Sequence, residues 1–202
     1  MGHLHDIVCG IGWDGLTALG TVALALISIF ALLYAKQQLN DFRKESKIKH
    51  LIDLVDQFER EPLAAYRSRL GAKRAPKGKL QPLDPDDPPP ELHDLLNFFE
   101  HMGYLLEGRY LELEDISVEF HYWIFHIWAD AREVIKSEQL DEPIYYEYFE
   151  RMVVRLGDRE HKRMGKFELP SKSEIEDFYT EEAHLPSGSP IPRQRRLKHR
   201  QG

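Results

Sequence analysis

The sequence predicts an all-α fold in which an N-terminal transmembrane helix continues into a stalk and then into an irregular cytoplasmic helical bundle. Three observations carry this prediction. Twenty consecutive positions, residues 16–35, hold no charge, proline, asparagine or glutamine. Apolar residues further along the chain recur with the 3.6-residue period of an α-helix. The strand-like alternation in YLELEDISVEF continues without a break into one of these helical stripes.

Residues 16–35 are predicted to cross a membrane. A helix of this length rises about 30 Å, which is the thickness of the hydrocarbon core of a bilayer. With 42% hydrophobic residues, the whole chain is too polar to contain several spans. We therefore expect the chain to contact the lipid bilayer through a single span, with Trp13 and Tyr34 in the headgroup zones at its ends.

The charges that flank the span predict its orientation. Residues 1–15 contain no lysine or arginine, and positive charge is enriched on the cytoplasmic side of membrane spans. Residues 1–15 should therefore be a short extracytoplasmic N-terminus, with the rest of the chain in the cytoplasm at the inner membrane. A cleaved secretory signal is the alternative, but the segment before the span lacks positive charge and no A-x-A pattern ends the apolar run. The basic residues that follow the span at the membrane interface are Lys36, Arg43, Lys44, Lys47 and Lys49.

The small residues of the span and the single cysteine bear on whether this chain associates with other chains. Thr17, Thr21 and Ala25 recur every four residues and leave a face at which another helix can approach closely, although such residues are common in any span. Self-association and a separate protein partner both stay open. The single cysteine, Cys9, excludes an intramolecular disulfide and a cysteine-based zinc site.

Residues 36–60 are predicted to be a stalk that becomes the first helix of the domain. Good helix formers fill the first part, and an apolar stripe with helical period follows. Pro62 disfavours helix in the residue before it, so this helix should end near Glu61. The stripe consists of Ile48, Leu51, Ile52, Val55 and Phe58.

Residues 61–183 are predicted to form the cytoplasmic helical domain. A short helix, PLAAYRSRL, precedes a loop at residues 75–90, whose six prolines exclude a regular element. The next helix should cover residues 91–108 and stop at Gly108.

Three more helices complete the predicted domain. Residues 114–140 should form its most buried helix, because the central segment FHYWIFHIW is apolar on almost all sides. A fifth helix should begin with Asp141 as its cap, followed by Glu142 and Pro143 in the first turn. Ser171 with Glu174 forms a capping box that opens a last helix of about a dozen residues.

Residues 184–202 are predicted to be a disordered basic tail. The net charge of the chain is −7, yet this tail ends in a cluster of basic residues without an acid. An acidic body argues against a protein that binds nucleic acid through a basic domain face. The tail alone could contact an anionic leaflet or nucleic acid, or stay solvated. Its basic residues are Arg193, Arg195, Arg196, Lys198 and Arg200.

The segment LLNFFEHMGYLLEGRYLELE, followed by an aromatic helix, resembles a bacterial family of single-pass membrane proteins known only as a domain of unknown function. The resemblance covers about residues 48–136 and implies an anchored helical module without assigned chemistry. The residues that carry it are Asn97, Phe98, Phe99, Glu100, Gly103, Gly108 and Trp128, with Arg67 or Arg69 upstream.

Glu100 is the carboxylate that the sequence singles out. It follows Leu96 by one helical turn and is flanked by Phe99 and Gly103, so it should be partly buried. A buried carboxylate requires a partner. We expect a structural ion pair with Arg67 or Arg69 of the short preceding helix.

No metal, cofactor or small-molecule substrate is predicted. A di-iron bundle needs two Glu-x-x-His pairs, and the sequence contains only one, Glu181 with His184. His121 and His126 are five residues apart and therefore diverge on a helix. The function favoured by the sequence is a non-enzymatic interaction or adaptor module of unknown pathway. The alternatives are a membrane-tethered enzyme with a site at Glu100, His101 and His126, and contact with nucleic acid through the basic tail.

Overall fold

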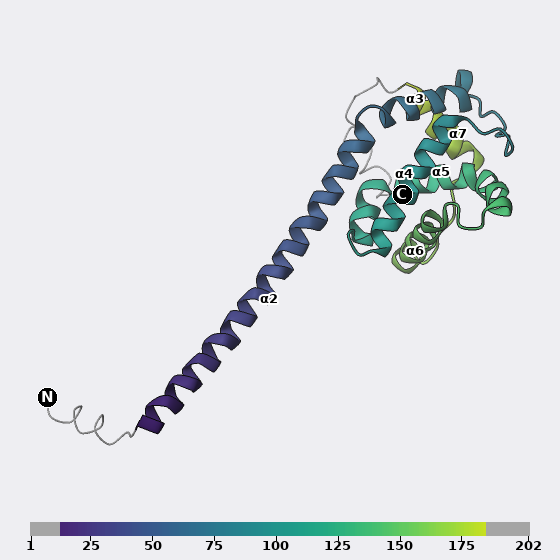
Figure 1. The fold of residues 1–202 in the computed structure, drawn as a ribbon. Helices are drawn as coiled ribbons and strands as arrows, with labels where there is room; N and C mark the ends of the chain where they lie inside the picture. Colours follow the sequence, from purple (N-terminus) through teal and green to yellow (C-terminus); the bar gives the residue numbers. More distant parts are fainter. Residues whose placement is uncertain (1–12, 185–202) are drawn as a thin grey trace. The chain divides into compact units, whose positions relative to one another are not determined.

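The computed structural model describes residues 13–184 of the chain, and these residues form helices without a strand (Figure 1). The all-α prediction is therefore confirmed for this part of the chain. The elements are α2 (Trp13–Glu59), α3 (Leu63–Arg74), the short 3-10 helix η1 (Pro76–Gly78), α4 (Pro90–Glu107), α5 (Leu113–Asp141), α6 (Glu147–Met164) and α7 (Lys172–Ala183).

The chain divides into two units, residues 1–46 and residues 47–202, and the boundary lies within α2. In the first unit every side chain from Thr17 to Ala35 is exposed. The hydroxyl of Thr21 donates to the carbonyl of Thr17 (2.9 Å), and that of Ser28 donates to the carbonyl of Leu24 (2.8 Å). These bonds satisfy both hydroxyls within the helix, so the segment has an apolar exterior. Within residues 13–184, α2 is the helix that is long and apolar enough to cross a membrane.

The second unit is built around α5, which contacts α4, α6 and α7. Its central residues are buried on several sides, as predicted from their apolar character. Trp128 meets Phe149 of α6 edge-on, with 5.4 Å between ring centroids, while Trp123 meets Phe58 edge-on at 5.3 Å. The last turns of α2 thereby enter the same core through Leu54 and Phe58, which are 4% and 2% exposed.

Two pairs of helices flank α5 and pack with their backbones close together. α3 lies against α7, and α4 lies against α6. A glycine allows each approach. A Cβ placed on Gly71 of α3 would lie 2.6 Å from the amide nitrogen of Ala183, and one on Gly103 of α4 would lie 3.0 Å from that of Phe149.

Most predicted boundaries agree with the structure within a few residues, but two predictions were wrong. The segment 75–90 contains the short helix η1, although its prolines were expected to exclude a regular element. The start of the fifth helix was also wrong. Asp141 is the last residue of α5, not a cap, and the following residues form a turn before α6 begins at Glu147. Tyr146, in the left-handed conformation (φ 56°), directs the chain into α6. Proline at position 143 looked like a first-turn residue because it is favoured there, but here it lies in the turn between two helices.

Gly108 was predicted to end α4, and Ser171 with Glu174 was predicted to open α7. α4 ends next to Gly108, but the left-handed residue there is Arg109 (φ 62°), since Gly108 itself keeps a right-handed φ of −70°. The capping box of Ser171 and Glu174 is present and opens α7.

Candidate functional site

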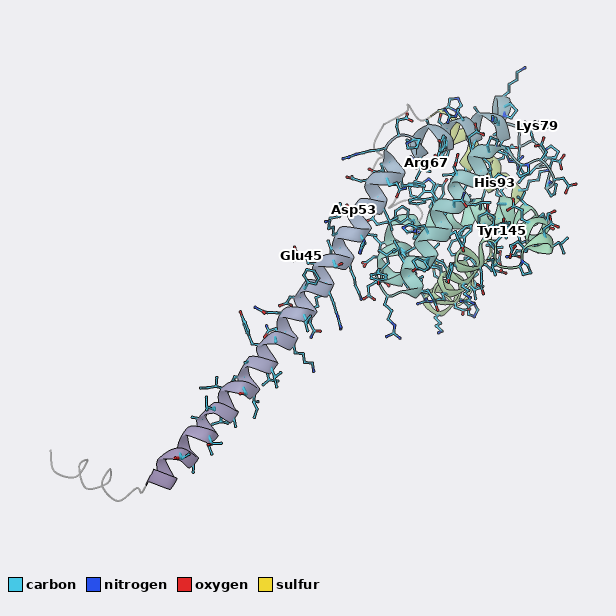
Figure 2. All side chains as sticks on the ribbon, in the orientation of Figure 1. Glu45, Asp53, Arg67, Lys79, His93 and Tyr145 are labelled. Atoms are coloured by element: carbon cyan, nitrogen blue, oxygen red, sulfur yellow. The ribbon has the colours of Figure 1, made fainter. Side chains whose placement is uncertain are left out.

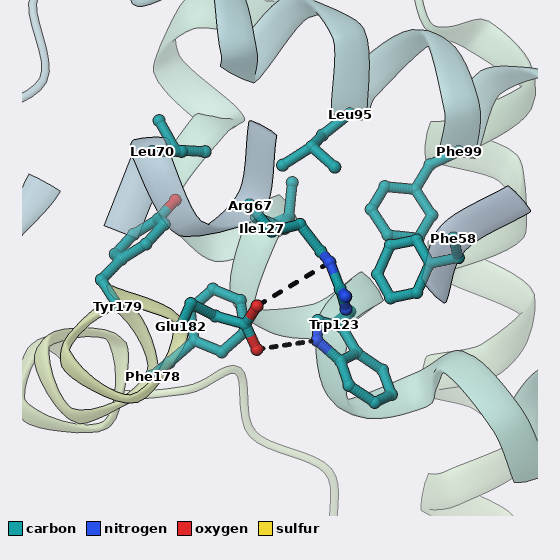
Figure 3. A pocket seen from close by; sticks show the side chains of 10 residues that line it. All are labelled: Phe58, Arg67, Leu70, Leu95, Phe99, Trp123, Ile127, Phe178, Tyr179 and Glu182. Carbon is teal, nitrogen blue, oxygen red and sulfur yellow. Dashed lines mark hydrogen bonds and ion pairs between the residues drawn. The ribbon is translucent and has the colours of Figure 1, made fainter. Parts of the chain in front are cut away.

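A buried ion pair joins α3 to α7 (Figure 3). Nε of Arg67 is 3.8 Å from Oε2 of Glu182, and the two side chains are 5% and 3% exposed. The two side chains point toward each other, and Trp123 and Ile127 of α5 lie beside them. Two full charges are thus held away from water, which costs several kcal/mol per ion unless other groups stabilise them.

Aromatic rings surround this ion pair. The guanidinium carbon of Arg67 lies 4.1 Å from the centroid of the Phe58 ring, at a distance typical of a cation–π contact. The indole Nε1 of Trp123 donates to Oε1 of Glu182 at 3.2 Å. Burial lowers the pKa of Arg67, although the charges of Glu182 and Glu59 oppose this shift. Arginine has so high an ordinary pKa that it stays charged here.

The free space beside the ion pair is small. It amounts to about 10 Å³, close to the minimum for one water molecule, and apolar side chains such as Leu70 and Ile127 form most of its walls (Figure 3). Nε and Nη1 of Arg67 make no hydrogen bond to the residues that the structure describes. A cavity of this size has no room for an organic substrate, so the geometry assigns Arg67 and Glu182 a structural role.

A second buried ion pair joins α3 to α5. Arg74 donates from Nε to Oδ2 of Asp130 at 3.0 Å and from Nη2 to Oδ1 at 2.5 Å, and its Nη1 donates to the carbonyl of Gln81. The hydroxyl of Tyr179, on α7, donates to Oδ2 of Asp130 at 2.7 Å. Burial raises the pKa of Tyr179, and the charge of Asp130 adds to this effect. The network therefore keeps the phenol neutral and fixes the proline-rich segment, through Gln81, to the helices.

Glu100 does not form the predicted ion pair. Its carboxylate instead accepts hydrogen bonds from the backbone amides of α6, from Tyr148 to Oε1 at 3.3 Å and from Phe149 to Oε2 at 2.7 Å. These amides belong to the first turn of α6, whose own N-cap residue, Tyr146, makes no side-chain cap. Glu100 is therefore a cap supplied by another helix, and the amides and the helix dipole offset part of the cost of burying its carboxylate.

The two arginines proposed for Glu100 pair with other acids. Arg67 lies opposite Glu182, as described above. Arg69 is 54% exposed, and its Nε lies 3.5 Å from Oε1 of Glu91. Lys73 contacts the same carboxylate at 2.8 Å. Burial acts to raise the pKa of Glu91, but the hydrogen bond from Lys73 and the nearby positive charges outweigh it, so the pKa is lowered.

Glu100, His101 and His126, the residues of the alternative catalytic site, each lie in a different environment. Glu100 caps α6, and His101 beside it is exposed. His126 is 8% exposed, its Nδ1 lies 2.6 Å from the carbonyl of Tyr122, and its ring stacks on Phe178 of α7. His121 contacts the carbonyl of Ser117 in the same way at 2.8 Å. Among residues 13–184, the structure contains no group of three His, Cys, Asp or Glu residues arranged to hold a metal.

The predicted interface residues lie on α2 or outside the described chain. Tyr34 is 64% exposed, and Lys36, Arg43, Lys44 and Lys49 are exposed as well. Lys47, in contrast, forms an ion pair with Glu112. Although α2 begins at Trp13, the side chain of this residue lies outside what the structure describes, and so do Cys9 and the tail residues Arg193, Arg195, Arg196, Lys198 and Arg200.

The sequence reasoning missed the acids that pair with the buried arginines. Asp130 is 56 residues from Arg74, and Glu182 lies still further from Arg67. One signal for Asp130 was its position in the apolar helix 114–140, where an acid requires a partner. Glu182 gave no such signal, because it sits beside Glu181 in an ordinary charged segment.

A protein-family model matches most of the chain. Residues 16–156 match the family described as Domain of unknown function (DUF4760), which covers α2 to α5 and part of α6. No curated protein and no solved structure matches the chain. The match is broader than the resemblance over residues 48–136, since it includes the apolar segment and ends beyond residue 140. As it covers more than half of the sequence, the chain belongs to the DUF4760 family of domains of unknown function.

Proposed function

We propose that this protein is a single-pass protein of the inner membrane whose cytoplasmic helical domain is an interaction module. The observation that carries the proposal is the exposed apolar exterior of α2 from Thr17 to Ala35. Leu24, Phe30 and Leu32 are 66%, 69% and 70% exposed there. Such a surface is unfavourable in water and favourable in hydrocarbon.

An exposed apolar corner of the domain supports the interaction role. At the turn between α5 and α6, Leu140 is 86% exposed, Ile144 is 66% exposed and Tyr145 is 50% exposed. Figure 2 labels Tyr145 at this turn. Apolar groups gathered at one surface site are typical of contacts with another protein. A tyrosine is well suited to such a contact, because its ring is apolar while its hydroxyl can bond to a partner.

Membrane insertion and orientation can be tested with the single cysteine. Cys9 precedes the span, so a membrane-impermeant maleimide should label it in spheroplasts that express the full chain. A Cys9→Ser, Lys166→Cys variant carries its thiol on an exposed residue of the domain and should react only after lysis. Labelling of Lys166→Cys in intact spheroplasts would show the opposite orientation. Extraction of the membranes with alkaline carbonate tests insertion itself: release of the full chain into the supernatant would contradict a transmembrane segment.

The interaction role requires a separate test. A photo-crosslinking amino acid at Ile144 should give defined protein adducts in cells, whereas the same group at exposed Lys162 on α6 should not. Equal adduct formation at both sites, or none at Ile144, would contradict a contact at this corner.

A further inference from the structure

We propose that two copies of this chain pair in parallel through one face of α2, so that the protein partner of this face is a second copy. The inference rests on the proposed membrane insertion and names a partner for it. The exposed apolar side chains beyond the span carry the argument. Between Lys36 and Ser46 all residues are polar or charged except Leu39 and Phe42, which are 58% and 69% exposed.

Lipid cannot cover Phe42. At about 1.5 Å per residue, this ring lies about 10 Å beyond Ala35, the last residue of the apolar run. The headgroup layer on each side of a bilayer is only about 5–7 Å thick. Phe42 is therefore in water on a helix, and an exposed aromatic ring there is best explained by a protein surface that covers it.

The positions of Leu39 and Phe42 indicate which surface this is. They occupy positions a and d of a heptad that extends back through the span without interruption. Every a and d position from 18 to 46 is uncharged, and those within the span are mostly small. Such a seam suits a second α2 helix, because small residues let helices approach inside the bilayer and large apolar residues fill the contact outside it. The seam consists of Ala18, Thr21, Ala25, Ser28, Leu32, Ala35, Leu39, Phe42 and Ser46.

The charges beside the seam fit a parallel pair. One flank carries Lys36 and Arg43 at e positions, and the other carries Gln38 and Glu45 at g positions. In a parallel coiled coil the e flank of one helix faces the g flank of the other. The basic flank of each copy therefore meets a flank without basic residues. Insertion with a common orientation also makes the two helices parallel.

Disulfide crosslinking of the full chain in isolated membranes tests the pairing. In a Cys9→Ser background, a single cysteine replaces Leu39 or Phe42 on the seam, or Asn40 or Lys44 on other faces of the same turns. After mild oxidation, the fraction of chain in a species of twice the mass should be at least several-fold larger for the Leu39 and Phe42 variants than for the Asn40 and Lys44 variants. Equal crosslinking on all faces, or adducts with a different protein at Phe42, would overturn the proposal.

A second set of variants tests the contribution of the apolar pair itself. With Ser28→Cys as the reporter inside the span, Leu39→Gln with Phe42→Gln should reduce dimer formation several-fold, while the matched change Asn40→Gln with Lys44→Gln should not. Carbonate extraction of the same membranes separates the two hypotheses. A chain that stays in the pellet without seam-specific crosslinks contradicts pairing alone, whereas a released chain contradicts insertion.

Discussion

The contribution of Glu100 to stability depends on pH, because its carboxyl group is half-buried while it accepts two amide hydrogen bonds from α6. Burial raises the pKa of Glu100 above its ordinary value of 4.5, while the hydrogen bonds from Phe149 and Tyr148 act in the opposite direction. The folded chain therefore holds this proton more tightly than the unfolded chain. The contribution of Glu100 to stability is thus present below its ordinary pKa and declines as the pH rises through the raised folded pKa.

Glu100→Gln should remove this part of the pH dependence. The amide has no proton to release, so the free energy of unfolding should fall less between pH 4 and pH 7 than in the unchanged protein. Glu100→Ala, which leaves both amides without the carboxylate, should lose about 1–3 kcal/mol. Both effects can be measured as the free energy of unfolding of residues 47–202, with urea denaturation monitored by circular dichroism at each pH in this range. Identical pH profiles for Glu100→Gln and the unchanged protein would contradict a raised pKa of Glu100 in the folded chain.

Arg67 and Glu182 should depend on each other. Arg67→Met leaves a buried carboxylate without its positive partner, which is expected to cost about 3–5 kcal/mol. The double variant Arg67→Met, Glu182→Gln removes both charges and keeps an oxygen that accepts from Trp123, so it should recover most of the loss. Denaturation of the two single variants and the double variant gives the coupling energy. Additive losses would show that the residues act independently.

At the scale of the elements, the close contact of α4 with α6 depends on Gly103. Gly103→Ala would place a methyl group against the backbone of Tyr148 and Phe149, which cannot move aside as a side chain can. We expect a loss of about 1–3 kcal/mol, despite the higher helix propensity of alanine.

Gly157→Ala in α6 is the matched control for this prediction. Its added Cβ would meet the ring of Phe167 at 3.0 Å, and that ring can shift. The gain in helix propensity should offset the shift, so the free energy of unfolding should change by less than about 1 kcal/mol. Equal losses in the two glycine variants would argue against a specific helix contact at Gly103.

Periodic elements could be predicted from the sequence, and contacts between them could not. The stripe from Ile48 to Phe58, the apolar segment before Trp128 and the capping box at Ser171 each contain their own signal within a few residues. The partner of Glu100 has no such signal, because a backbone amide is present at every position except proline. The predicted start of α6 was wrong for a related reason, since nothing in the residue type of Tyr146 indicates its left-handed conformation.

At the scale of the whole molecule, α7 lies outside the family match yet completes the core of the domain. It supplies Glu182 to Arg67 and the hydroxyl of Tyr179 to Asp130, and its Phe178 is 2% exposed. A chain that ends at Met164 should therefore fail to unfold cooperatively, because Arg67 loses its counter-charge and the apolar surface under α7 meets water.

Truncation after residue 184 is the control for this prediction, because it removes none of the contacts described here. Thermal denaturation of both shortened chains tests the contribution of α7. A cooperative transition at an unchanged temperature in the chain that ends at Met164 would contradict it.

The two tryptophans of α5 face different neighbours, and this makes the domain its own optical reporter. The indole of Trp123 donates to a residue of α7, while that of Trp128 packs on a residue of α6. With either one replaced by phenylalanine, in a fragment without Trp13, the emission of Trp128 would follow the departure of α6, while that of Trp123 would follow α7 and the last turn of α2. Stopped-flow fluorescence of these two variants would thus reveal which helix detaches first when the domain opens.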